Sequence, residues 1–138
     1  MKQDISFDPV EGVSVAVVPD EPVLMPEGPS IWQVYLLNHN SFPLRNVIVN
    51  ANGYGLREDG EKVRTSTLRF LFDEVPPHTA VPIEPLDSGL FHLNNQYWVS
   101  YYRGDQVFDK KFIFVPDSIT ADNFTHIALL DKEGVLHG

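Results

Sequence analysis

The chain has 138 residues, no cysteine, and nineteen Asp and Glu against ten Lys and Arg, which gives a formal charge of −9. Its length suits one domain, and its hydrophobic fraction of 43% and aromatic fraction of 12% are those of a folded chain rather than a disordered one. The absence of cysteine excludes disulfides, thiolate nucleophiles and cysteine-based zinc sites. The acidic balance argues against direct binding of nucleic acid, whose phosphates attract basic faces.

The N-terminal sequence MKQDISFDPVEG lacks the apolar core of a signal peptide, and no apolar run reaches the ~18 residues of a membrane span. We therefore expect no membrane span. A chain without cysteine is expected in the cytoplasm, and secretion followed by removal of a signal peptide is the alternative.

Short apolar runs, separated by Pro and Gly, follow one another at intervals of about 8–15 residues, a spacing typical of all-β sandwiches and barrels. Side chains alternate within these runs, so that Trp32, Val34 and Leu36 share one face. The proline-rich stretch 19–30 predicts a loop, because proline cannot donate to a strand ladder. About seven strands are predicted, at 12–19, 31–38, 45–55, 63–72, 96–103 and 106–116, with a short edge strand within 73–87.

After residue 116 the pattern changes. PDSITADNF predicts a short helical turn capped by Asp117 or Ser118, and THIALLDKEGVLHG predicts a small hairpin that turns at 131–134. We expect a single β-sandwich domain over 1–138, with the sandwich in 1–116 and a C-terminal extension in 117–138 that packs on it or on a partner.

The stretch YYRGDQVF lies between the last two long predicted strands. If Gly104-Asp105 is a two-residue hairpin loop, Tyr101 faces Phe108 and Tyr97 faces Phe112, which gathers the aromatic rings on one inner face. A turn is thus a sufficient explanation of Arg-Gly-Asp. Display of this tripeptide to an integrin, as in the similarly placed loop of a fibronectin type III module, is the other interpretation.

The opposite face of that hairpin is unusually apolar for the outer surface of a sandwich, of which each sheet buries only one face. Three kinds of cover are open: the C-terminal segment 118–137, a second copy of the chain or another protein, and a sugar stacked on aromatic rings. The candidate binding residues are Trp98, Tyr102, Val107, Ile113 and Val115.

No pattern of catalytic or metal-binding residues is recognisable. The five histidines show no paired-ligand spacing, and no GxSxG, Walker or GxGxxG motif is present. A glycosidase needs two carboxylates across a cleft, and the nearest candidates are Asp73-Glu74 and Asp105/Asp109. We predict no catalytic residue, no cofactor and no metal.

Two segments resemble the immunoglobulin-like β-sandwich domain that accompanies Smr (small MutS-related) nuclease domains in some bacterial proteins. They are VSVAVVP followed by WQVYLLNHNSFPLRNVIVN, and KKFIFVPDSITADNF as a last strand before a Phe-containing segment. The resemblance implies a bacterial, immunoglobulin-like accessory module, and the activity of the nuclease domain is not carried over to this chain. A generic immunoglobulin or fibronectin type III sandwich fits the pattern equally.

The predicted fold is therefore an all-β, immunoglobulin-like sandwich. Its predicted function is that of a non-catalytic interaction or accessory module that binds a protein partner or forms a homodimer. The alternatives are a carbohydrate-binding module that uses Trp98 and Tyr102, and a hydrolase with an unrecognised carboxylate site.

Overall fold

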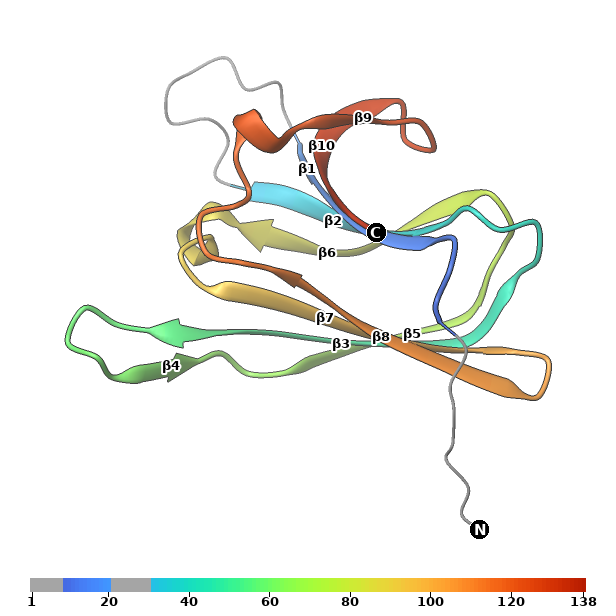
Figure 1. Ribbon diagram of the computed structural model, residues 1–138, viewed down its shortest axis with the longest axis horizontal. Coiled ribbons are helices and arrows are strands. Elements are labelled where there is room, and N and C mark those ends of the chain that lie inside the picture. Colours follow the sequence, from blue (N-terminus) through green and yellow to red (C-terminus); the bar gives the residue numbers. More distant parts are fainter. Residues whose placement is uncertain (1–8, 21–30) are drawn as a thin grey trace, which may run out of the picture.

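The computed structural model describes residues 9–20 and 31–138, which form two antiparallel β-sheets facing each other (Figure 1). The loop expected at 19–30 falls mostly outside these residues. The described chain contains ten strands, more than the seven expected, and two short 3₁₀-helices. The elements are β1 (Val13–Pro19), β2 (Ile31–Asn38), β3 (Leu44–Leu56), β4 (Lys62–Arg64), β5 (Leu68–Val75), β6 (Thr79–Asp87), η1 (Ser88–Leu90), β7 (Asn94–Arg103), β8 (Gln106–Phe114), η2 (Ala121–Asn123), β9 (Thr125–Ile127) and β10 (Lys132–His137).

The first sheet has the order β6-β2-β1-β10-β9. Its strand β1 lies between β2 and β10, and every residue from Val13 to Val18 is buried. Both faces of this strand are therefore covered. Val15 and Val17 face the second sheet, while Ala16 and Val18 belong to a smaller apolar cluster on the other side.

The second sheet is built on the long strand β3. Strand β7 pairs along one edge of β3 and β8 lies beyond it, while β4 and β5 pair with successive parts of the other edge. The sequence run expected as one strand at 63–72 is thus divided in two. The β3–β4 hairpin extends past the end of the first sheet (Figure 1).

The inner faces of the two sheets form the main core, as the alternation predicted. Trp32, Val34 and Leu36 of β2 are buried there. From the second sheet, Val49 and Phe112 are fully buried. A fully buried large apolar side chain stabilises a fold by about 1.5–3 kcal/mol relative to its exposed state, so this layer holds the sandwich together.

The predicted register of the last hairpin is confirmed. Tyr101 lies opposite Phe108 and Tyr97 lies opposite Phe112, and all four rings are buried. The rings of Tyr101 and Phe108 stack with centroids 5.3 Å apart. Gly104 has φ +61°, which a glycine adopts without strain, and Asp105 follows it in the two-residue turn. A single positive φ at the first turn position fits the expected type II′ turn.

Strand β6 is longer than predicted from its prolines. It spans nine residues and pairs with β2 along its whole length, with a bulge at Val34/Tyr35. It is an edge strand, as expected, and this position explains how Pro82 and Pro85 are tolerated. A proline nitrogen on the unpaired side of an edge strand costs no ladder hydrogen bond.

The C-terminal segment differs from the prediction in two details. Its helical part is only the three-residue η2, whose N-cap is Thr120 rather than Asp117 or Ser118, and whose cap lacks a side-chain hydrogen bond. The hairpin exists, but β9 and β10 pair Ile127 with Lys132, so the turn lies at 128–131. The turn therefore lies three residues before the predicted turn at 131–134, which was placed there because of Gly134.

Gly134 has a packing role instead. A Cβ atom added there would lie 2.7 Å from the carbonyl oxygen of Val17, closer than real Cβ contacts. The glycine therefore allows β10 to approach its neighbour β1 closely. The same strand then pairs Val135 with Val17, in register with the core.

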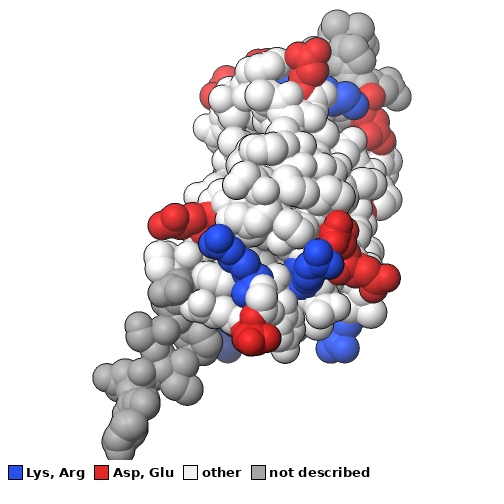
Figure 2. Space-filling view, turned by 90° about the vertical axis from the view of Figure 1, so that its right-hand side faces the viewer, with Lys and Arg blue, Asp and Glu red and all other residues white. Residues whose placement is uncertain are grey.

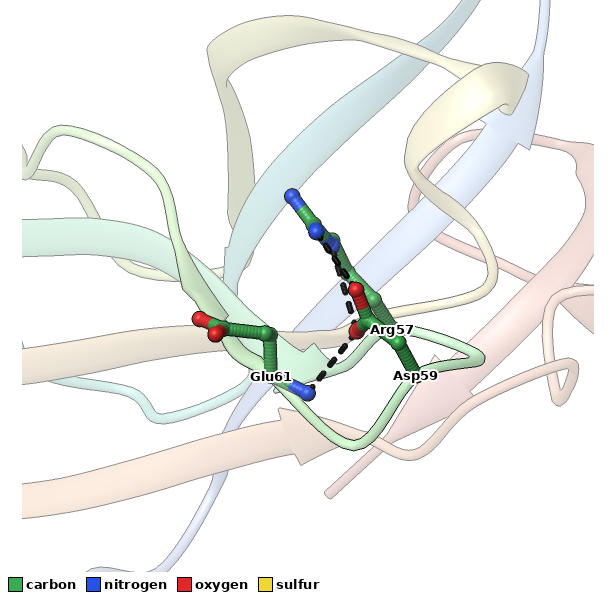
Figure 3. A network of polar contacts seen from close by, with 3 residues as sticks. All are labelled: Arg57, Asp59 and Glu61. Atoms are coloured by element: carbon green, nitrogen blue, oxygen red, sulfur yellow. Dashed lines mark hydrogen bonds and ion pairs between the residues drawn. The ribbon is translucent and has the colours of Figure 1, made fainter.

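The exposed β3–β4 turn is closed by a polar network (Figure 3). The guanidinium of Arg57 donates to Asp59 at 2.7 Å, and the backbone N–H of Glu61 donates to the same carboxylate at 3.0 Å. These two contacts lower the pKa of Asp59 below its usual value, the Arg57 contact more strongly. Gly60, at φ +86°, completes the turn.

Candidate functional site

The outer face of the second sheet holds the predicted binding residues. Trp98 and Tyr102 point outward from β7 and are 39% and 41% exposed. Val107 lies directly opposite Tyr102 on β8, so these two side chains are cross-strand neighbours. Ile113 lies on the same face of β8 and is partly buried, whereas Val115 is exposed one residue beyond the end of that strand.

Two further apolar residues extend this surface, and sequence reasoning did not include them. Ile48 of β3 lies opposite Ser100 of β7, and Leu71 of β5 lies opposite Ile48. Leu71 is 69% exposed. The alternation within each strand placed Ile48 away from the core side, but only the pairing of β3 with β5 and β7 shows that these residues join Trp98. We call the surface formed by Ile48, Leu71, Trp98, Tyr102 and Val107 the open face.

Charged side chains of both signs lie among these apolar groups. Arg45 and Glu74 form an ion pair of 2.9 Å, and Asp109 lies opposite Ser100. The other two cations are Lys111, whose ammonium lies 4.6 Å from the centre of the Trp98 ring, and Arg69, whose Nε donates to Asn50 at 3.3 Å. Three cations against two carboxylates make this surface nearly neutral in a chain of formal charge −9.

The C-terminal segment does not cover the open face. It runs along the first sheet, where Ile127 packs with Ala16, Val18 and Leu37. In Figure 1, β10 curves upward from beside β1, so that β9 and the β9–β10 turn lie well away from β7 and β8. Of the three covers considered from the sequence, the chain's own tail is therefore used on the opposite outer surface, which we call the covered face.

The Arg-Gly-Asp sequence forms the β7–β8 turn. Arg103 places its guanidinium carbon 3.7 Å from the centre of the Phe42 ring, a cation–π contact with the loop before β3. Asp105 is exposed in the turn. Figure 2 views the molecule from the end at which this turn lies, and shows acidic and basic side chains mixed in its lower half below a broad uncharged surface.

The carboxylates considered for hydrolysis are spread over separate positions. Asp105 lies in the turn and Asp109 on the open face, while Glu74 is held by Arg45. Residues 9–20 and 31–138 hold no group of three or more His, Cys, Asp or Glu side chains placed to bind a metal ion.

The histidines have separate surroundings. Ser14 Oγ and His39 Nε2 lie 2.9 Å apart, and His126 Nδ1 lies 2.9 Å from a carboxylate oxygen of Glu133. His137 packs edge-on against Phe112 and Phe114. Burial, and after it the charge of Lys110, lowers the pKa of His137.

Comparisons with known proteins give no relative: no family model, no curated protein and no solved structure matches the chain. In the part of the chain that the structure describes, no helix has the length and apolar character needed to cross a bilayer.

Proposed function

We propose that the protein is a non-catalytic interaction module that docks through the open face, and that a second copy of the chain is the partner. The observation that carries this proposal is the exposure of Trp98 and Tyr102 together on an outer sheet surface, where the described chain leaves both rings partly open to solvent. Large aromatic side chains are enriched among the residues that dominate binding energy in protein interfaces.

The charge distribution favours a second copy. Two chains of formal charge −9 repel each other over most of their surface. The open face is nearly neutral and carries cations such as Arg69 and Lys111 beside the carboxylates of Asp109 and Glu74. Two such faces brought together can pair opposite charges around an apolar centre, which suits the self-complementary contact of a two-fold dimer.

The strand order supports the finer fold assignment that we propose. Strands β1, β2 and β6 lie in one sheet and β3, β7 and β8 in the other. This is the division of the A, B, E strands and the C, F, G strands in immunoglobulin-like sandwiches. The kinship with Smr-associated accessory domains stays a prediction from the two sequence segments.

Sedimentation velocity over a wide range of protein concentration tests the proposal. We expect the wild-type chain to pass from monomer to dimer, and Trp98→Ala to weaken the dimer by more than about tenfold, since truncation of a central aromatic anchor costs about 2 kcal/mol or more. Leu71→Ala should weaken it as well. A wild-type chain that stays monomeric at high concentration contradicts the proposal.

Leu136→Ala is the matched control for Leu71→Ala. Leu136 is an exposed leucine of β10 in the first sheet, and it lines a hollow with Ile113 and Val115 rather than with Leu71 or Trp98. It should leave the dimer unchanged. If it weakens the dimer as much as Leu71→Ala does, the contact lies elsewhere on the molecule.

Carbohydrate binding is a second candidate, because amide and hydroxyl groups adjoin the aromatic rings. Asn50 lies opposite Trp98, and Gln96 and Ser100 flank Trp98 on the same face of β7. Such groups hydrogen-bond sugars while rings stack on them. Glycan titration should then change tryptophan fluorescence in the wild-type chain but not in Trp98→Phe, which retains only the buried Trp32. A flat wild-type response across a broad glycan panel removes this candidate.

A further inference from the structure

A concave site lies on the other side of the second sheet from the open face, where the two sheets separate. It is a cavity of about 350 Å³ between the edge strand β6, the β4–β5 link and the inner surface of β3 and β7. This volume falls within the range of about 300–1,000 Å³ that small-molecule sites occupy. Leu68 marks the opening, since it lies on the inner side of β5, opposite Ala51, yet is 51% exposed.

The walls of the cavity are mainly apolar, with two carboxylates. Leu86 and Leu90 join Leu68 and Ala51 in the lining. Glu84 and Asp87 supply the acids, and among the described residues the lining includes no Lys or Arg. A region with an apolar body and only negative charge is complementary to an organic cation.

Glu84 is unusual because it is an ionisable residue on the inner side of a strand. It lies opposite Val34, whose side chain is in the core, so the carboxyl group points inward from the edge strand. The hydroxyl of the buried Tyr97 donates to Glu84 Oε2 at 2.9 Å and fixes the carboxyl group. Burial raises the pKa of Glu84, and the Tyr97 hydrogen bond partly offsets that shift. A carboxylate that is costly to keep charged is stabilised by a cation placed beside it.

Asp87 stands on the same strand, three residues after Glu84. Its Oδ1 accepts a hydrogen bond from the backbone N–H of Gly89 at 2.7 Å, which holds the side chain at the start of η1. The cavity thus has two acids whose positions are set by the fold, one inside and one at the exposed rim.

We propose that this cavity binds a small organic ammonium ion, with the ammonium group at Glu84 and the apolar body against Leu68, Leu86 and Leu90. The site is separate from the open face and does not depend on the proposed dimer. An inward carboxylate on an edge strand also discourages unwanted strand pairing, so the experiment has to show binding and not only a structural effect.

NMR titration with 2-phenylethylammonium tests the proposal, with 2-phenylethanol as the neutral probe of similar shape. The backbone amides of Glu84, Leu86 and Tyr97 should shift saturably with the ammonium probe. The alcohol should bind at least about tenfold more weakly, because it lacks the charge that pairs with a partly buried carboxylate. Equal binding of the two probes, or no saturable shift at these amides with either, overturns the proposal.

Three variants locate the site. Glu84→Gln keeps an acceptor for Tyr97 and should weaken the ammonium probe at least about tenfold, whereas Glu61→Gln, the same change in the exposed β3–β4 turn, should not. Leu68→Trp fills the opening from a half-exposed position and should abolish binding of both probes. Unchanged affinity in both Glu84→Gln and Leu68→Trp shows that the probe binds elsewhere and refutes the site.

Discussion

The two sheets of this sandwich treat their outer faces in opposite ways. On the first sheet the C-terminal segment folds back, and Ile127 is 2% exposed against Ala16, Val18 and Leu37. On the second sheet no segment of the described chain lies over Trp98, and the aromatic and aliphatic side chains of the open face remain in contact with solvent. In this chain, the outer face of one sheet is covered by the chain itself, and the outer face of the other sheet is exposed to solvent.

The two outer faces differ in composition, because one is buried under the C-terminal hairpin and the other contacts water. The covered face is made mainly of aliphatic side chains, with Tyr35 packed beside them, and the strand beneath it is buried from Val13 to Val18. The open face alternates apolar residues with Arg, Lys and Asp, so it tolerates water. A surface that stays soluble yet presents aromatic anchors is typical of a reversible interface rather than a permanent one.

Ile127→Ala should have the largest effect of the substitutions that compare the two faces. It removes a buried side chain under the C-terminal hairpin, and such truncations cost about 2–5 kcal/mol of unfolding free energy. Leu71→Ala on the open face should change the stability of the monomer by no more than about 0.5 kcal/mol. Urea denaturation of both variants at low protein concentration measures the difference. Similar losses would mean that the open face is also a structural contact.

Gly134→Ala should have the next largest effect. The added methyl group meets the backbone carbonyl of Val17, which cannot move aside without disturbing β1. Overpacking of this kind costs about 1–3 kcal/mol. In Gly55→Ala the nearest atom is the flexible end of Leu93 at 3.1 Å, so the cost should be smaller. Hydrogen exchange of the β10 amides, measured beside urea denaturation, should show local loosening in Gly134→Ala only.

The fold was predictable where local pattern decides it. Alternation predicted the inner faces of β2 and β7, and the Gly104-Asp105 turn predicted the register of β7 and β8. The turn of the C-terminal hairpin was placed wrongly because Gly134 resembles a turn glycine in sequence. Its actual reason, close approach to Val17, is a contact between residues more than a hundred positions apart, and no local signal reports it.

The candidate sites were predictable only in part, for the same reason. Part of the open face was predictable, because the alternation of side chains along β7 places Trp98 and Tyr102 on its outer face. The other part of the open face, Ile48 and Leu71, depends on which strands are neighbours. The Glu84–Tyr97 pair was not predictable from the sequence. A glutamate between two prolines suggests a loop residue, and only the pairing of β6 with β2 shows that it belongs to a strand.

Glu84→Gln should have the smallest effect on stability, and that effect should depend on pH. Glu84 lies between the two sheets, away from both outer faces. Because burial raises the pKa of Glu84, the native state holds its proton more tightly than the unfolded chain, and wild-type stability falls as pH rises from the ordinary pKa of about 4.5 through the raised one. Below both pKa values the carboxyl group is neutral in either state, so the variant should match the wild type. At neutral pH the variant avoids the cost of a desolvated charge and should have the higher melting temperature. Thermal denaturation of the two proteins from acidic to neutral pH measures this divergence, and Glu61→Gln should show none of it. A constant offset at every pH would mean that the side chain acts through shape alone, and that the inward carboxylate carries no electrostatic cost that a bound cation could relieve.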